Sequence, residues 1–455
     1  MPCRLLVAVL AALPLLASAQ ETLTIDAALA EAERASPDLA AARARLEQAR
    51  AGVAHVRAGY LPQITAGATY TRNSDQAKLQ LPVSFAVRDV GVPTSGAGLP
   101  GSPTNLAIVP TQVMGETIQK TDQLGAQLEL TQAILAPSLW YSIDAASANA
   151  RASAETTEAA RQELRFGVAQ AYYAASAAEK AVAIQERQLA VTQTHEKDAR
   201  VQLEAGQQPQ ITVLRAQIDR NRAEQDLVRA RNGVRVAKSA LAALLGRPDS
   251  VEFAIVTPPA PPLPAELAGL EDEALRRRPE LKAAAAGVDA ASAIRRAANA
   301  RYLPTLGAFG VGRWANVAGF TGKEESWAAG LSLTWSLYDG GAREADRRDA
   351  GARLAEAEAT RASIANRTRD EVRRARLDLD SARANHATAE EQAALARENQ
   401  RLVEISFRAG QGTSLEATDA NEALATAEVS AVREGLAADL AALRLLRAVG
   451  VYAEQ

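Results

Sequence analysis

Two long stretches without proline constrain this chain more than any other feature. Residues 343–408 contain one glycine, Gly351, and residues 138–205 contain only Gly167. An α-helix rises about 1.5 Å per residue, so each stretch predicts a rod about 100 Å long. Helices of compact globular proteins average about 11 or 12 residues. The two stretches therefore predict an elongated, mainly α-helical protein rather than a compact enzyme.

The composition and the apolar spacing favour paired rods. Hydrophobic residues make up 47% of the chain but aromatic residues only 4%, and much of the difference is alanine. Alanine forms helices well, but it buries too little surface for a thick core. In residues 343–408, coiled-coil spacing is kept by Ile364, Val372, Ala375, Leu379 and Ala382, and then by Leu395 and Leu402. We expect turns at Gly206 and Gly410, followed by antiparallel return helices over residues 212–245 and 413–449.

Short landmarks occur twice in the same order, which indicates a duplicated unit. The pairs are Ser36-Pro37-Asp38-Leu39 with Arg278-Pro279-Glu280-Leu281, Tyr60-Leu61-Pro62 with Tyr302-Leu303-Pro304, Leu128-x-Leu130-Thr131 with Leu331-x-Leu333-Thr334, and Ala205-Gly206-Gln207 with Ala409-Gly410-Gln411. The first copy is longer between Pro62 and Leu128, which places an additional loop there. We expect the copies at residues 20–250 and 266–455, joined by a stiff proline-rich linker at 251–265.

The first residues have the pattern of a secretory signal peptide. A basic residue, Arg4, precedes an apolar run over residues 5–16, and Ala17-Ser18-Ala19 forms a small-x-small cleavage site. We therefore expect residues 1–19 to be removed; a buried N-terminal helix is the alternative. The only cysteine, Cys3, would be lost with the signal, leaving neither a disulfide nor a lipid-anchored cysteine.

Two segments alternate in polarity with the period of a β-strand. In residues 327–337 one face carries Trp327, Leu331 and Trp335, and the other carries small or polar residues. Residues 123–134 alternate in the same way, whereas the segments after Pro62 and Pro304 alternate less cleanly. A transmembrane β-strand requires this pattern, but a soluble half-buried hairpin gives it too.

Four strands in one chain cannot form a closed sheet in a membrane. The edge strands would leave their N–H and C=O groups without partners in hydrocarbon. Three chains together would supply twelve strands, an even number that can close around a polar lumen. The alternative is a soluble four-stranded sheet that spans nothing. The exported start and the amphipathic strands favour the closed barrel.

The order of these motifs resembles that of the TolC family of outer-membrane efflux proteins. The resemblance covers residues from about 23 to 450 and rests on three features. These are Tyr-Leu-Pro before the first strand of each half, Leu337-Tyr338-Asp339-Gly340-Gly341 after the last strand, and Phe407-x-x-Gly410 followed by Glu416 and Asp419. It implies a homotrimer whose four strands per chain build a twelve-stranded β-barrel in the outer membrane of a Gram-negative bacterium. Duplicated long helical hairpins would continue the barrel as an α-helical tunnel into the periplasm.

The resemblance also implies a function and its partners. The function would be passive export of substrates through a channel-tunnel. The partners would be a periplasmic adaptor protein and an inner-membrane pump, in a tripartite efflux pump or a type I secretion system. A soluble periplasmic coiled-coil adaptor or scaffold is the alternative, because such proteins also carry long helical hairpins. They usually have one hairpin inserted in a small β-rich domain, whereas this sequence has two complete copies.

The resemblance assigns roles to residues at the helical turns. Glu416 and Asp419 project from one side of their helix, and in a trimer they would form two negative rings at a periplasmic gate. The alternative is that both are solvated charges of a coiled coil, and the first copy has Thr212 where an acid is common. The expected adaptor-docking tips are Leu203, Gly206, Gln207, Phe407, Gly410 and Gln411. The glycines would supply left-handed turns, and Leu203 and Phe407 would pack across the tip or contact the adaptor.

Further residues are assigned to the barrel and to the junctions between helix and strand. Glu129 is expected to face the lumen, because its neighbours Leu128 and Leu130 point outward. Trp327 and Trp335 are expected on the barrel, either at a membrane interface or in ordinary packing near the junction. The expected junction residues are Pro62, Pro304, Tyr338, Asp339 and Gly340.

No sequence pattern indicates an enzyme, a cofactor or a metal site. His55, His195 and His386 lie along helical segments without metal-ligand spacing. The glycines around Gly310 do not open a helix, so they do not form a nucleotide-binding loop. The net charge is −3, without the basic stripe of a nucleic-acid-binding protein.

Overall fold

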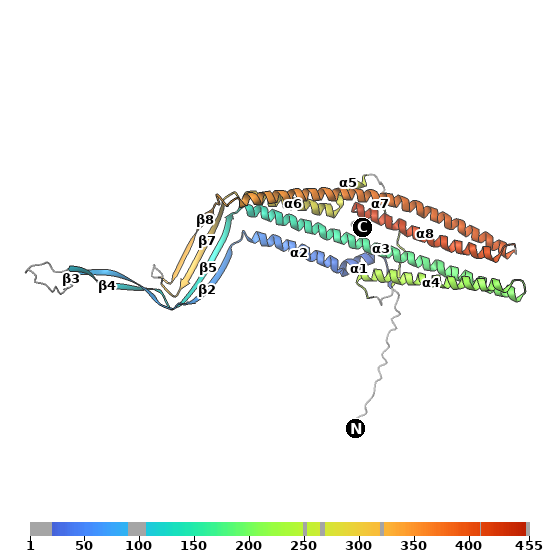
Figure 1. The fold of residues 1–455 in the computed structure, drawn as a ribbon, viewed down its shortest axis with the longest axis horizontal. Helices are drawn as coiled ribbons and strands as arrows, with labels where there is room; N and C mark the ends of the chain where they lie inside the picture. Colours follow the sequence, from blue (N-terminus) through green and yellow to red (C-terminus); the bar gives the residue numbers. More distant parts are fainter. Residues whose placement is uncertain are drawn as a thin grey trace, which may run out of the picture. The chain divides into compact units, whose positions relative to one another are not determined.

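The computed structural model describes residues 21–89, 106–248, 253–263, 269–318, 323–409 and 411–451. The elements up to residue 245 are β1 (Glu21–Leu23), α1 (Ile25–Ala35), α2 (Pro37–Ala58), β2 (Gln63–Arg72), β3 (Ala77–Asp89), β4 (Leu106–Gln119), β5 (Asp122–Leu135), α3 (Pro137–Glu204) and α4 (Gln210–Leu245) (Figure 1). Those that follow are β6 (Phe253–Ile255), α5 (Leu270–Arg277), α6 (Pro279–Ala300), β7 (Thr305–Ala315), β8 (Glu325–Thr334), α7 (Ala342–Arg408) and α8 (Ser414–Val449). The expected signal peptide 1–19 and Gly410 lie outside the described residues.

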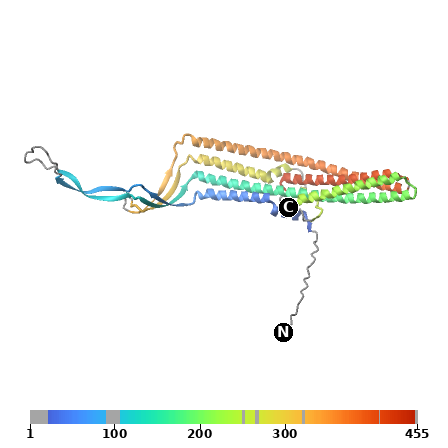
Figure 2. The same cartoon turned by 60° about the horizontal axis from the view of Figure 1, so that its bottom comes forward.

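The two predicted rods are confirmed. Helix α3 is 68 residues long and α7 is 67 residues long, and each is followed by a return helix, α4 or α8, of 36 residues. Figures 1 and 2 show α3 and α4 as one long helical hairpin and α7 and α8 as another. No helix within the described part of the chain is long and apolar enough to cross a membrane.

Elements recur in the same order along the chain. A short helix, a 22-residue helix, a strand pair and a long hairpin occur once as α1, α2, β2, β5, α3 and α4. The order recurs as α5, α6, β7, β8, α7 and α8. The first half additionally contains β3 and β4, which pair with each other in the segment where the sequence predicted only a loop. This segment has no counterpart in the second half, so comparison of the two halves could not identify its strands.

The chain forms two compact units. The helical unit comprises Met1–Arg50, Ala148–Asp289 and Ala355–Gln455, and the sheet unit comprises Ala51–Ser147 and Ala290–Leu354. The sheet unit contains a four-stranded antiparallel sheet in the order β2-β5-β7-β8 and the two-stranded β3-β4 ribbon. Because β2 and β8 are the outer strands, each has one edge without a neighbouring strand in this sheet.

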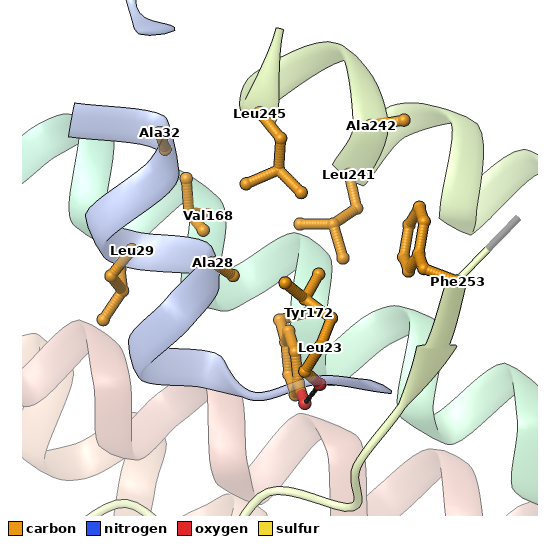
Figure 3. Close-up of a cluster of buried hydrophobic side chains, with 10 residues drawn as sticks. All are labelled: Leu23, Ala28, Leu29, Ala32, Val168, Tyr172, Leu241, Ala242, Leu245 and Phe253. Carbon is orange, nitrogen blue, oxygen red and sulfur yellow. Dashed lines mark hydrogen bonds between the residues drawn. The ribbon is translucent and has the colours of Figure 1, made fainter. Parts of the chain in front are cut away.

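The core of the helical unit is divided into small clusters. One joins β1, α1, α3, α4 and β6, with Tyr172 fully buried at its centre (Figure 3). The Tyr172 hydroxyl lies 2.8 Å from the Leu23 carbonyl oxygen and 2.7 Å from that of Val256. A second cluster packs α5 against α7 and α8. A third joins the two hairpins, because Phe166, Ala169 and Tyr173 of α3 pack against Leu443 of α8.

Local physical chemistry explains the duplicated landmarks. Ser36 caps α2 by accepting a hydrogen bond from the Leu39 amide at 3.2 Å, and Pro37 occupies the first helical position, where no N–H is needed. Helices α2 and α6 both end in a tight turn before Pro62 and Pro304. The Leu61 amide donates to Ala58, and the Leu303 amide donates to Ala300, each at 3.0 Å. Proline then ends each helix and the chain continues as a strand.

Candidate functional site

The first hairpin turns through a glycine with a left-handed backbone. Gly206 has φ +71°, and its amide donates to the Leu203 carbonyl at 2.9 Å. The Gln207 amide donates to the Gln202 carbonyl at 2.8 Å. Together these two bonds form a Schellman motif, which satisfies the last carbonyl groups of a helix. The structure therefore gives Gly206 the conformational role that the sequence predicted.

The second tip ends its long helix in a similar way. The Gln411 amide donates to the Ser406 carbonyl at 2.9 Å, which matches the Gln207 bond of the first tip. Phe407 lies one residue further along α7 and is half-buried. Its ring stacks on the His195 imidazole of α3, with a distance of 6.3 Å between ring centroids. Phe407 thus packs between the two hairpins, and His195 is a tip residue that the sequence analysis did not select.

Glu416 takes part in a helix cap. Its carboxylate accepts a hydrogen bond from the Thr413 amide at 2.8 Å, and the Thr413 hydroxyl accepts one from the Glu416 amide at 3.3 Å. This reciprocal capping box stabilises the start of α8. The Thr413 amide bond also lowers the pKa of Glu416. Asp419, one turn later, is exposed, and its role as a gate charge stays a prediction, as does that of Glu416.

A series of polar side-chain contacts joins the two hairpins. Near the tips, the Thr418 hydroxyl of α8 donates to Asp219 of α4 at 3.3 Å. The Arg222 guanidinium lies 3.7 Å from the Glu422 carboxylate, and His195 Nε2 lies 3.6 Å from Glu404. These contacts connect residues about 200 positions apart in the sequence. Their spacing along the helices depends on how the hairpins pack, and no local sequence signal predicts it.

Further from the tips, Glu428 is held by two arginines. Arg187 of α3 donates to one of its carboxylate oxygens at 2.8 Å, and Arg397 of α7 donates to the other at 2.7 Å. Burial disfavours the Glu428 charge, but the two hydrogen-bonded guanidinium groups outweigh this effect and lower its pKa. One carboxylate therefore joins three helices.

A cavity of about 260 Å³ lies between the hairpins beside these contacts. Its lining comes from α3, α4 and α8, together with Phe407 of α7. Its buried lining includes Thr192, Ala199, Ala223 and Asn421, and its more open part carries carboxylates. No group of three or more potential metal-ligating side chains is present among the described residues.

The sheet unit carries the predicted barrel residues on two chemically different faces. The strand register places Ile64, Leu128 and Trp327 on one face, with Leu331 and Leu333 further along β8. These side chains are exposed, Trp327 at 83%. Glu129 and Gln127 lie on the opposite face, level with Thr65 and Gly67. Trp335 follows β8, and its indole N–H donates to the Tyr302 carbonyl at 3.1 Å.

The predicted junction residues shape the entry into α7. Gly340 has φ +72°, which turns the chain after Tyr338, an exposed residue. Asp339 then accepts hydrogen bonds from the amides of Gly341 and Arg343, both at 3.2 Å, and from the Arg343 guanidinium at 2.8 Å. Arg343 also lies over the Tyr302 ring, 4.8 Å from its centroid. Asp339 thus caps α7 and fixes the arginine that packs on the Tyr-Leu-Pro motif.

Comparisons with known proteins agree with this architecture. A family model described as "Outer membrane efflux protein" matches residues 28–247 and 270–451. The chain is 32% identical over 251 residues to protein CyaE of Bordetella pertussis; the match covers 53% of this chain and 52% of CyaE, about half of each protein. VceC of Vibrio cholerae has a similar fold, with TM-score 0.71, 19% identity, and coverage of 94% of this chain and 96% of VceC. The MtrE channel of Neisseria gonorrhoeae has TM-score 0.69, 22% identity, and coverage of 94% and 88%.

The family match covers both long hairpins and all four strands of the sheet. The similar solved structures extend the likeness in fold to nearly the whole chain. Family and fold are those of transport channels rather than of enzymes, and they do not favour a soluble adaptor. The resemblance inferred from the sequence is therefore confirmed: the chain belongs to the outer membrane efflux protein family, the family of TolC-like channels.

Proposed function

We propose that three copies of this chain assemble into one passive export conduit without catalytic activity. Its family places the protein in the outer membrane of a Gram-negative bacterium, with the channel extending into the periplasm. We further propose that residues 1–19 are a cleaved signal peptide. Residues 20–250 and 266–455 would be two copies of one structural unit, joined by the linker 251–265.

The two faces of the sheet carry this proposal. An exposed apolar face containing Ile64, Leu128 and Trp327 suits lipid, and a face containing Gln127 and Glu129 suits a water-filled lumen. The outer edges of β2 and β8 would each need a strand partner in hydrocarbon. If the β8 edge of one copy pairs with the β2 edge of the next, three copies close a twelve-stranded barrel.

The tips are the proposed docking region for a periplasmic adaptor. The first tip would present Leu203, Gly206 and Gln207, and the second Phe407, Gly410 and Gln411. The adaptor would connect the conduit to an inner-membrane pump, which would supply the energy for export, in a tripartite efflux pump or a type I secretion system. Asp419, and in part Glu416, would line a cation-attracting constriction near the tips.

Cross-linking across the strand edges tests this assembly. The single cysteine of the chain is Cys3, within the proposed signal peptide, so the mature chain offers a cysteine-free background. We would replace Ala68 on β2 and Ala329 on β8 with cysteine and treat outer membranes with a flexible bismaleimide. The apolar faces of both strands carry these positions. The proposal predicts covalent dimers and trimers.

The matched controls are the two single variants, Ala68→Cys and Ala329→Cys. Each single variant carries a cysteine on only one of the two strands that would pair between copies, so it should give no covalent trimer. The protein should also require detergent for extraction from outer membranes. A monomeric periplasmic protein that carbonate releases from membranes without detergent would contradict the proposal and favour the soluble scaffold.

A further inference from the structure

The cavity between the hairpins has an acidic lining. Four carboxylates line it, from Asp198, Asp219, Asp226 and Glu422, against one guanidinium, that of Arg222. Some of these charges already have partners: Asp226 pairs with Arg229 at 2.9 Å, and Arg222 lies 3.7 Å from Glu422. Asp198 has no hydrogen-bond or ion-pair partner in the described part of the chain. Arg229 and Arg222 thus offset two of the four negative charges, and Asp198 and Asp219 leave the cavity with a net negative potential.

A second observation concerns a polar side chain of the same cavity. Asn421 on α8 is only 5% exposed and lines the same cavity. Its side-chain amide has no hydrogen-bond partner among the residues that the structure describes. The amide therefore obtains its hydrogen bonds from whatever occupies the cavity, either water or a polar ligand. The Asn421 amide thus offers the cavity an acceptor oxygen and a donor nitrogen.

We propose that this cavity binds a small organic cation that carries an ammonium or guanidinium group. The cationic head would donate to the Asn421 oxygen and to the Asp198 carboxylate. The methylene groups would lie against the small apolar side chains of Ala199 and Ala223. Phe407 also lines the cavity and adds aromatic surface, which favours a cation further.

Binding would link the two hairpins. Asp198 lies on α3 of the first hairpin and Asn421 on α8 of the second, so one ligand contacts both. The volume of about 260 Å³ suits a short aliphatic chain with one or two charged ends. An anion would meet the four carboxylates and is excluded by their repulsion. The bound cation therefore stabilises the arrangement in which the hairpins lie together.

Calorimetry with agmatine as the probe tests the proposal on the purified, detergent-solubilised chain. Agmatine carries a guanidinium and an ammonium group on a four-carbon chain. We expect one site per chain with a dissociation constant of about 1 mM or tighter at low salt, and weaker binding at high salt. Glutarate, a dianion of similar length, should not bind. Agmatine should also raise the unfolding midpoint of the chain.

Three variants locate the site. Asn421→Ala and Asp198→Asn should each weaken agmatine binding at least tenfold and abolish the shift in midpoint. Asp198 is exposed, so its variant keeps the fold even if Asn421→Ala does not. Asp378→Asn removes an exposed carboxylate of α7 outside the cavity and should bind agmatine as the parent does. Absence of binding to the parent, equal binding by Asp198→Asn, or comparable binding of glutarate would each overturn the proposal. The measurement depends on neither trimer formation nor an adaptor.

Discussion

Arg187 on α3 donates a hydrogen bond to Glu428 on α8 across the boundary between the two helical hairpins, at 2.8 Å. The Glu428 side chain is 14% exposed, whereas that of Arg187 is 62% exposed. The carboxylate is thus the sheltered partner, and Arg397 of α7 holds its second oxygen. Movement of one hairpin away from the other must break the Arg187 bond.

Glu428→Gln should loosen the contact between the hairpins. The change removes the charge that both arginines share and leaves a neutral amide, which binds the two guanidinium groups more weakly. We expect a loss of about 1–2 kcal/mol in the free energy of unfolding. Spin labels on Thr194 of α3 and Ala423 of α8, both exposed, should report a broader distance distribution. The control is Glu398→Gln, because Glu398 pairs with Arg401 on the same helix at 2.6 Å and should leave the distribution unchanged.

The pair between Glu31 and Arg247 should make stability depend on acid pH. Arg247 donates two hydrogen bonds to the Glu31 carboxylate, at 2.5 and 2.6 Å, and these bonds lower the pKa of Glu31 against the effect of burial. A lowered carboxyl pKa stabilises the folded state above the unfolded value of about 4.3, and this contribution is lost as pH falls through the folded pKa. Thermal unfolding of Glu31→Gln should therefore show a lower midpoint than the parent at pH 7 and a smaller difference at pH 3.

The matched control for this pH profile is Glu47→Gln. Glu47 pairs with Arg50 one turn away, and both side chains are more than half exposed. An exposed pair of this kind contributes about 0–1 kcal/mol. The Glu47→Gln curve should therefore run parallel to the parent curve. If Glu31→Gln also ran parallel, the Arg247 pair would not be a source of the acid sensitivity.

Tyr172→Phe should destabilise the helical unit through one hydroxyl group. The ring is fully buried, and its hydroxyl lies within hydrogen-bond distance of the carbonyl oxygens of Leu23 and Val256. Without the hydroxyl, the buried Leu23 carbonyl loses this donor, at a cost of about 1–3 kcal/mol. Chemical denaturation measures the change. Tyr141→Phe is the control, because the Tyr141 ring lies under Arg296, 5.3 Å from its guanidinium, and its hydroxyl has no protein partner among the described residues.

Glycines at the first tip and within α4 should respond in opposite ways to alanine. Gly206→Ala places a side chain at φ +71°, which costs about 1–2 kcal/mol. Gly233 lies within α4, and a methyl group added there would meet no neighbouring atom within 4 Å, so Gly233→Ala should stabilise by about 0.4–1 kcal/mol. Limited proteolysis at the tip and thermal unfolding report the two effects. Equal behaviour of both variants would contradict the assignment of Gly206 to a left-handed turn.

The long helices could be predicted closely from the sequence, but the contacts between them could not. The sequence placed the rods at 138–205 and 343–408, within one residue of the ends of α3 and α7, because proline and glycine mark helix ends. The contact between His195 and Phe407 joins different hairpins. Its position depends on the packing of alanine-rich surfaces, which fit together in many registers. The ribbon of β3 and β4 was missed because it has no counterpart in the second half.

The capping box shows a different limit of the sequence analysis. Thr413-x-x-Glu416 carries the sequence signature of this cap, and the structure forms it. The resemblance to the family assigns Glu416 to a gate, whereas the local pattern of Thr413 and Glu416 predicts the cap that the structure forms. Asn421 carries no sequence signal, because its buried and unpaired state arises only when α8 packs against the first hairpin.

Substitutions of Glu416 and Asp419 should distinguish a structural role of the acid in capping α8 from an electrostatic role in the pore. Thr413→Ala removes the hydroxyl of the capping box and should destabilise the start of α8 by about 0.5–2 kcal/mol, measured by hydrogen exchange of its first turn. Glu416→Gln keeps an oxygen that can accept from the Thr413 amide, so its effect on hydrogen exchange should be smaller. Asp419→Asn removes an exposed carboxylate that forms no such cap, so hydrogen exchange should not change. If both acids line a pore, Asp419→Asn should reduce the block of channel conductance by multivalent cations more than Glu416→Gln does, because the Glu416 carboxylate is turned toward the Thr413 amide. Larger loss of block in Glu416→Gln would show that the cap opens in the assembled channel and releases the carboxylate into the pore.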